Sequence, residues 1–93
     1  MFDQILRQIR EKVRNRHYVM TIHADDEMND DGMNIFDVES IIFTGEIVER
    51  QKDATSDEWK YIIEGETLNG HSGTVVTKVS LTGKVVFITV WLA

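Results

Sequence analysis

Three histidines are the residues of this 93-residue chain whose side chains are best suited to acid–base chemistry. His17 and His23 are 6 positions apart and His71 follows 48 positions later, so no pair has the helical spacing of a metal site. An imidazole at the junction of a helix and a sheet can act as a general acid or base. A histidine near a helix start is more often structural. His23 is the one that we retain as a catalytic candidate.

A run of acids over residues 25–31 is the second feature with a chemical interpretation. Aligning the following Gly32 as the sixth residue of an EF-hand loop places oxygen-bearing side chains at alternating positions. The twelfth residue is then Val38, where the loop needs a bidentate glutamate. The run is therefore predicted to be a solvated helix face that ends at Gly32, and binding of a metal ion or small ligand there is a third-ranked hypothesis. We expect no metal and no cofactor.

The aromatic residues raise the question of a base-stacking platform, which Trp59, Tyr61, Phe87 and Trp91 would form if they shared an exposed sheet face. Aromatics that alternate along strands are more often part of a core. Tyr61 and Trp91 each carry a polar group suited to a sheet edge or an interface.

Composition and charge limit the classes of protein to consider. The net charge is −6 with a pI near 4.9, which argues against generic nucleic-acid binding because phosphate contacts dominate that affinity. Residues 1–16 nevertheless carry a local charge of +3, and residues 17–50 carry −8. These opposite charges would favour self-association or docking on an acidic partner. The chain has no cysteine and no apolar run of about 20 residues, so we expect a cytoplasmic protein without disulfides that does not enter a membrane.

The elements that must position these side chains follow from hydrophobic periodicity. We predict one domain over residues 1–93, with a basic amphipathic helix at 1–16, two short helices within 21–45 and an antiparallel meander at 46–92. Thr21 and Asn34 are predicted N-caps, with Asp37 completing a capping box, and Gly32 and Gly45 end the two short helices. The fold class is α+β, with the helices packed on one face of a curved four-stranded antiparallel sheet.

Four short motifs, in this order and at this spacing, resemble the domain of unknown function family 4258, a family of small bacterial proteins. They are TIHA at 21–24, GEIVE at 45–49, KYIIEG at 60–65 and VFITVW at 86–91. The resemblance covers residues 17–92. It implies a fold like that of the RelE-type toxins of toxin–antitoxin systems, a group that includes metal-independent ribonucleases.

The resemblance also implies site residues. The polar positions that match are His23, Lys60 and Thr89, as catalytic candidates for cleaving RNA from the ribose 2′-hydroxyl. With the arginines of the basic first helix, which lies outside the resemblance, the residues predicted to bind RNA or a protein partner are Arg7, Arg10, Arg14, Arg50, Tyr61 and His71. Glu27 and Asp31 stand where relatives tend to carry cations.

Two functions from different classes follow. The preferred one is a protein-interaction or accessory module without strong catalysis, because acids replace the cations at two positions beside the expected site. The alternative is a toxin-like ribonuclease that binds RNA through the basic first helix, and RNA is a partner only under that alternative.

Overall fold

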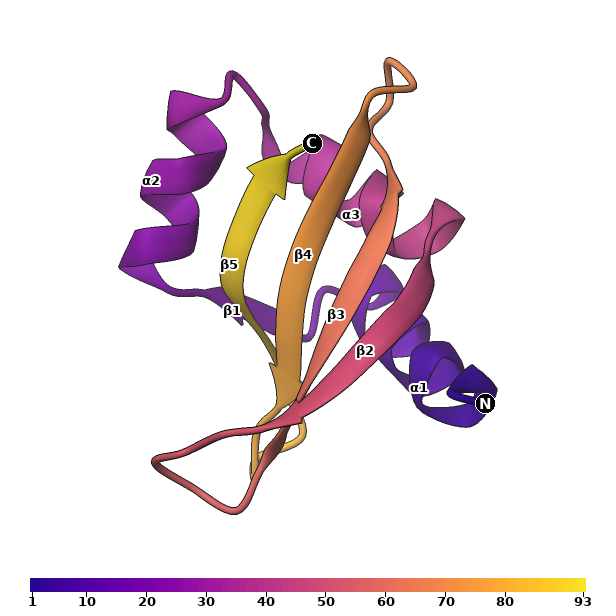
Figure 1. Ribbon diagram of the computed structural model, residues 1–93, viewed down its shortest axis with the longest axis vertical. Helices are drawn as coiled ribbons and strands as arrows, with labels where there is room; N and C mark the ends of the chain where they lie inside the picture. The colour runs from indigo at the N-terminus through magenta and orange to yellow at the C-terminus, as the bar shows by residue number, and fades with distance from the viewer.

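The computed structural model describes residues 1–93 as three helices and one five-stranded sheet (Figure 1). The helices are α1 (Asp3–Arg14), α2 (Ile22–Asp30) and α3 (Ile35–Thr44). The strands are β1 (Tyr18–Met20), β2 (Glu46–Lys52), β3 (Trp59–Glu66), β4 (Ser72–Val79) and β5 (Val85–Leu92). Strands β2 to β5 form the predicted antiparallel meander, which confirms the α+β class.

The sheet is mixed, with strand order β1-β5-β4-β3-β2, so the predicted four-stranded antiparallel sheet is wrong in this detail. The additional strand is β1, which pairs in parallel with β5 and places Tyr18 opposite Val85. A three-residue strand is too short to show a period-2 pattern. Its partner also lies far away in the sequence, so no turn signals the pairing.

Local capping signals set the ends of α2 and α3 where the sequence predicts them. The hydroxyl of Thr21 accepts a hydrogen bond from the amide of Ala24 at 3.0 Å. Asn34 and Asp37 form the reciprocal capping box. Gly32 has φ +71° and begins the chain reversal after α2, as expected for a glycine past a helix end.

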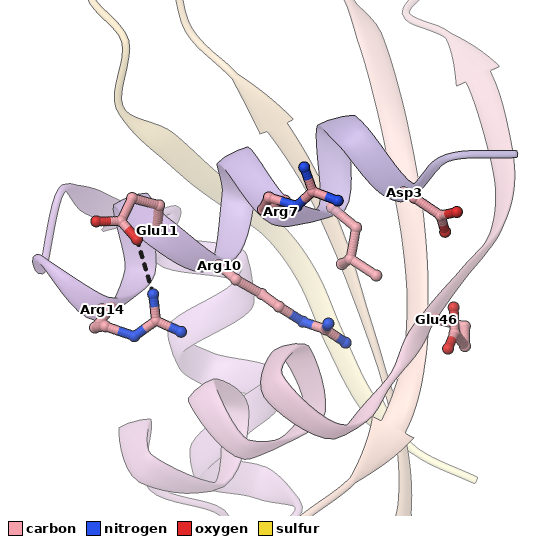
Figure 2. A pocket seen from close by; sticks show the side chains of 7 residues that line it. Asp3, Arg7, Arg10, Glu11, Arg14 and Glu46 are labelled. Carbon is pink, nitrogen blue, oxygen red and sulfur yellow. Dashed lines mark hydrogen bonds and ion pairs between the residues drawn. The ribbon is translucent and has the colours of Figure 1, made fainter.

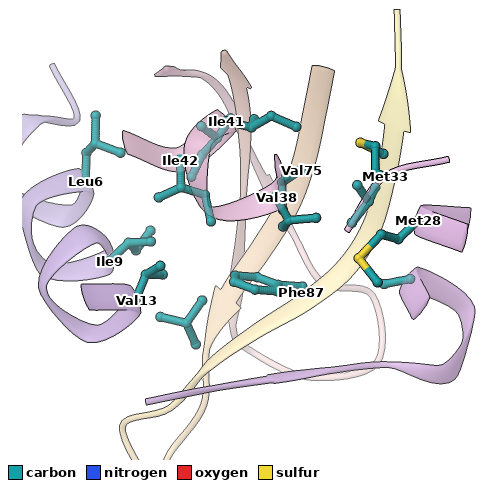
Figure 3. Packing of buried hydrophobic residues seen from close by; sticks show 14 residues of the cluster. Leu6, Ile9, Val13, Met28, Met33, Val38, Ile41, Ile42, Val75 and Phe87 are labelled. Atoms are coloured by element: carbon teal, nitrogen blue, oxygen red, sulfur yellow. The ribbon is translucent and has the colours of Figure 1, made fainter. Parts of the chain in front are cut away.

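Two helices, α1 and α3, cover one face of the sheet, and the core lies between these helices and the sheet (Figures 1 and 3). Phe87 of β5 is fully buried there, in the same cluster as Ile9 of α1 and Ile41 of α3. The C-terminal end of α3 lies directly on the backbone of β2 and β3. A Cβ atom on Gly65 would overlap the carbonyl oxygen of Ile41, so this close approach requires glycine.

The remaining helix, α2, lies beside the edge of β5 rather than over a face (Figure 1). Ala24 and Met28 are the residues that it buries in the core. One face of the sheet is therefore packed against helices, and no helix covers the other, which we call the open face.

Candidate functional site

Side chains of the open face follow from the strand registers. Val75 and Val90 are fully buried on the core side, so their neighbours Val76 and Thr89 project from the other side. The registers place the open-face side chains in three rows. The middle row is Ile62, Val76 and Thr89; one flanking row is Lys60, Lys78, Val86 and Val19; the other is Glu64, Thr74 and Trp91.

The centre of this face is apolar although no helix lies over it. Val19 and Trp91 have 43% and 39% of their surfaces exposed, and Ile62, Val76 and Val86 are half-buried. Isolated exposed apolar residues need no explanation, but a contiguous set on neighbouring strands marks an interaction surface. The open face is therefore the feature of the structure best suited to binding.

Charges of opposite sign lie at the two ends of the open face. Lys60 and Lys78 are at one end, and Glu64 is at the other. The ammonium group of Lys78 lies 3.3 Å from Glu58 and 3.7 Å from Asp53. The backbone amide and hydroxyl of Thr55 hold the pKa of Asp53 below its usual range, with a smaller contribution from Lys78. Lys60 makes no ion pair and is the free cation of this end.

The edge of β5 is sealed by Glu27 of α2 and by Asp31, the C-cap residue of that helix. Glu27 accepts a hydrogen bond from the amide of Val90 at 3.1 Å, and Asp31 accepts one from the amide of Leu92 at 3.0 Å. Glu27 and Asp31 are four residues apart, a rise of about 6 Å along a helix. Val90 and Leu92 are two residues apart, about 6.6 Å along a strand. The two acids can therefore meet alternate amides of the strand edge. The two acids thus have a structural partner, which their interpretation as lost RNA contacts did not anticipate.

The three catalytic candidates lie in different places. Lys60 and Thr89 share the open face, but β4 lies between their strands, which are therefore about 10 Å apart. His23 is at the start of α2, its side chain is 69% exposed, and its Nε2 lies 3.3 Å from Glu27. No contact links any two of the three. Their catalytic role stays a prediction.

Two of the cations in the basic first helix, Arg10 and Arg14, make contacts within the fold. Arg10 donates hydrogen bonds to the carbonyl oxygens of Ile42 at 3.0 Å and Gly45 at 2.6 Å, and so caps the C-terminal end of α3. Arg14 pairs with Glu11 at 2.8 Å. Both line a hollow of about 350 Å³ together with Arg7 of the same helix. Figure 2 shows these three side chains on α1. Of the three predicted binding arginines of α1, only Arg7 has no partner.

The other predicted binding residues are dispersed. Arg50 stacks over Trp59, with its guanidinium carbon 4.0 Å from the ring centroid. Tyr61 packs edge-on against Phe2 with ring centroids 6.4 Å apart, on the core side of the sheet. His71 is exposed in the turn between β3 and β4. The six residues predicted to bind RNA or a partner do not form one surface.

One half-buried polar contact has no local signal in the sequence. The hydroxyl of Tyr18 donates a 2.6 Å hydrogen bond to Glu39, and its ring stacks on Phe87 at 4.7 Å. Burial raises the pKa of Tyr18 to about 12, and the hydrogen bond to the Glu39 carboxylate adds to the effect. The two residues lie on β1 and α3, so only the folded chain brings them together.

Fold and surface together define a small α+β domain with one helix-covered and one open sheet face. The chain belongs to the family described as Domain of unknown function (DUF4258), which matches residues 20–92. No curated protein and no solved structure matches the chain. None of its helices has the length and apolar character needed to cross a membrane.

Proposed function

We propose that this protein is an interaction module that binds another protein chain through the open face of its sheet. The observation that carries the proposal is the apolar centre formed by Val19, Ile62, Val76, Val86 and Trp91, on which no helix of the chain lies. Covering apolar surface contributes roughly 25 cal/mol per Å², so a partner that packs on this face gains free energy without any rearrangement of the fold.

The charge distribution supports a protein partner over RNA. Binding of a polyanion depends on several free cations on one surface. Arg10 and Arg14 are engaged within the fold, and Arg50 is stacked on Trp59. On the open face, Lys78 is paired with Glu58 and Asp53, which leaves Lys60 as the only cation of the three rows without an ion pair. The ribonuclease alternative therefore has less support than the interaction module.

Site-specific photo-crosslinking in the cell of origin tests this function. We would replace Trp91 with benzoylphenylalanine, which keeps a large aromatic side chain on the open face. The control carries the same photoreactive residue at Leu81, whose side chain is 99% exposed in the β4–β5 hairpin. We expect a discrete crosslinked protein from position 91 and none from position 81. Absence of any crosslink from position 91 would refute the proposal.

A further inference from the structure

We propose that the occupant of the open face is a second copy of this chain, packed face to face about a two-fold axis that runs across the strands. The inference rests on the proposed function, because it names the partner of the same surface. A two-fold interface must be self-complementary: if one residue contacts another in the second copy, the reverse contact also occurs. The three rows of the open face meet this requirement.

The middle row supplies the apolar contact on the axis. With the axis along this row, Ile62, Val76 and Thr89 each meet the same residue of the second copy. Each of these contacts joins two aliphatic side chains or two threonine methyl groups, so none of them buries a charge. Strands of the two copies then lie face to face, as in the two layers of a β-sandwich.

The flanking rows supply the charge complementarity. They lie on opposite sides of the middle row, each about 7 Å away, because each is two residues along the strands. The two-fold axis exchanges them. Lys60 and Glu64, both on β3, therefore face each other across the interface twice, once in each direction. On β5 the same exchange places Val86 against Trp91.

The orientation of the axis is determined by these side chains. An axis along the strands would exchange β3 with β5, and would place Lys60 against Val86 and Glu64 against Trp91. Both charges would then lose water without gaining a partner, which is costly. The crosswise axis pairs the charges and the apolar groups at the same time.

Lys78 faces Thr74 in this arrangement and keeps its ion pairs with Glu58 and Asp53 of its own copy. Glu49 is the one residue that opposes the arrangement. It continues the middle row onto β2, and so lies near its own copy. It is exposed and accepts a 2.6 Å hydrogen bond from Gln51 at the sheet edge, where twisted sheets diverge. Neutralising it should therefore tighten the contact.

The area of the open face sets the expected affinity of the dimer. Four strands at about 4.8 Å spacing and eight residues at about 3.3 Å cover about 500 Å² per copy, or about 1,000 Å² in total. This is at the lower end of specific interfaces. We therefore expect a concentration-dependent dimer rather than an obligate one.

Sedimentation of the full chain over a range of concentrations tests the inference through a charge-reversal cycle. Lys60→Glu or Glu64→Lys creates two like-charge contacts and should weaken the dimer about tenfold. The double variant should restore it. An equimolar mixture of the two single variants should form a heterodimer, because every pair of facing charges is then opposite. Glu49→Gln should tighten the dimer.

Matched controls separate contact from net charge. Arg7→Glu and Asp26→Lys change the charge by the same amounts at exposed positions of α1 and α2, outside the open face, and should leave the dimer unchanged. Thermal unfolding verifies that each variant is folded. A monomeric wild type at all concentrations would overturn the inference, as would weakening that neither the double variant nor the mixture reverses.

The photo-crosslink at position 91 distinguishes failure of this inference from failure of the proposed function. A crosslinked species of twice the 10.7 kDa chain mass supports the second copy. A crosslink to a different protein, with a monomeric purified chain, overturns the dimer and retains the interaction module.

Discussion

Helices cover one face of the sheet and leave the other open, although the strands place apolar residues on both faces. Val75 and Val76 are neighbours on β4; the first is completely buried on the core face and the second is half-buried on the open face. Strands that are apolar on both faces usually lie between two layers. Here α1 and α3 form one layer and α2 lies at the edge. Under the proposed function, the second layer comes from another chain.

The largest expected effect on stability distinguishes the two faces through these two valines. Val75→Ala removes two buried methyl groups and should lower the free energy of unfolding by about 2 kcal/mol. Val76→Ala should lower it by less than about 0.7 kcal/mol when measured at a concentration where the chain is monomeric. Urea unfolding of both variants gives the difference. Equal losses would mean that the open face is packed within the monomer.

A smaller effect is expected at the edge sealed by α2. Glu27→Ala should cost about 1 kcal/mol, because the amide of Val90 loses its charged acceptor. Hydrogen exchange of that amide should accelerate about fivefold. Asp26→Ala, one position away with no contact to the strand, is the control for the change in helix propensity. If the amide of Val90 exchanges at the same rate in both variants, Glu27 does not seal the edge.

The smallest expected effect is on the pH dependence of stability, and it compares the neighbours Tyr18 and Val19 on β1. Because the pKa of Tyr18 is about 12 when folded and about 10 when unfolded, the folded chain holds this proton more tightly. Its contribution to stability is therefore complete below pH 10 and is lost as pH rises towards 12. Tyr18→Phe should flatten the stability curve in this window.

Val19→Ala is the control for that experiment, since Val19 is 43% exposed on the open face and has no ionisable group. Its stability between pH 10 and 12 should fall in parallel with that of the wild type. A Tyr18→Phe curve that also runs parallel to the wild type would contradict the assignment.

Local patterns were sufficient to predict the helices and the meander. The capping box of Asn34 and Asp37 and the end of α2 next to Gly32 were confirmed, since they depend on residues a few positions apart. β1 was missed, because its partner β5 lies more than sixty residues further along the chain. The RelE-type fold implied by the resemblance stays a prediction.

Side-chain roles were harder to predict than elements. Arg10 reads as a solvent-facing cation until α3 is packed against α1, when its guanidinium reaches two backbone carbonyls. Glu27 and Asp31 read as part of a solvated run until α2 lies beside β5. The open face was foreseen only in part, through Trp91 as a residue suited to an interface. Each of these roles depends on tertiary contacts that no local spacing encodes.

Fluorescence of Trp91 tests the central claim, burial of the open face by a second copy, most directly. In a Trp59→Phe variant, Trp91 is the only tryptophan and reports on the open face alone. We predict that its emission shifts to shorter wavelength and that iodide quenches it less as protein concentration rises through the range where sedimentation detects the dimer. Emission and quenching that stay constant over that range would contradict the account.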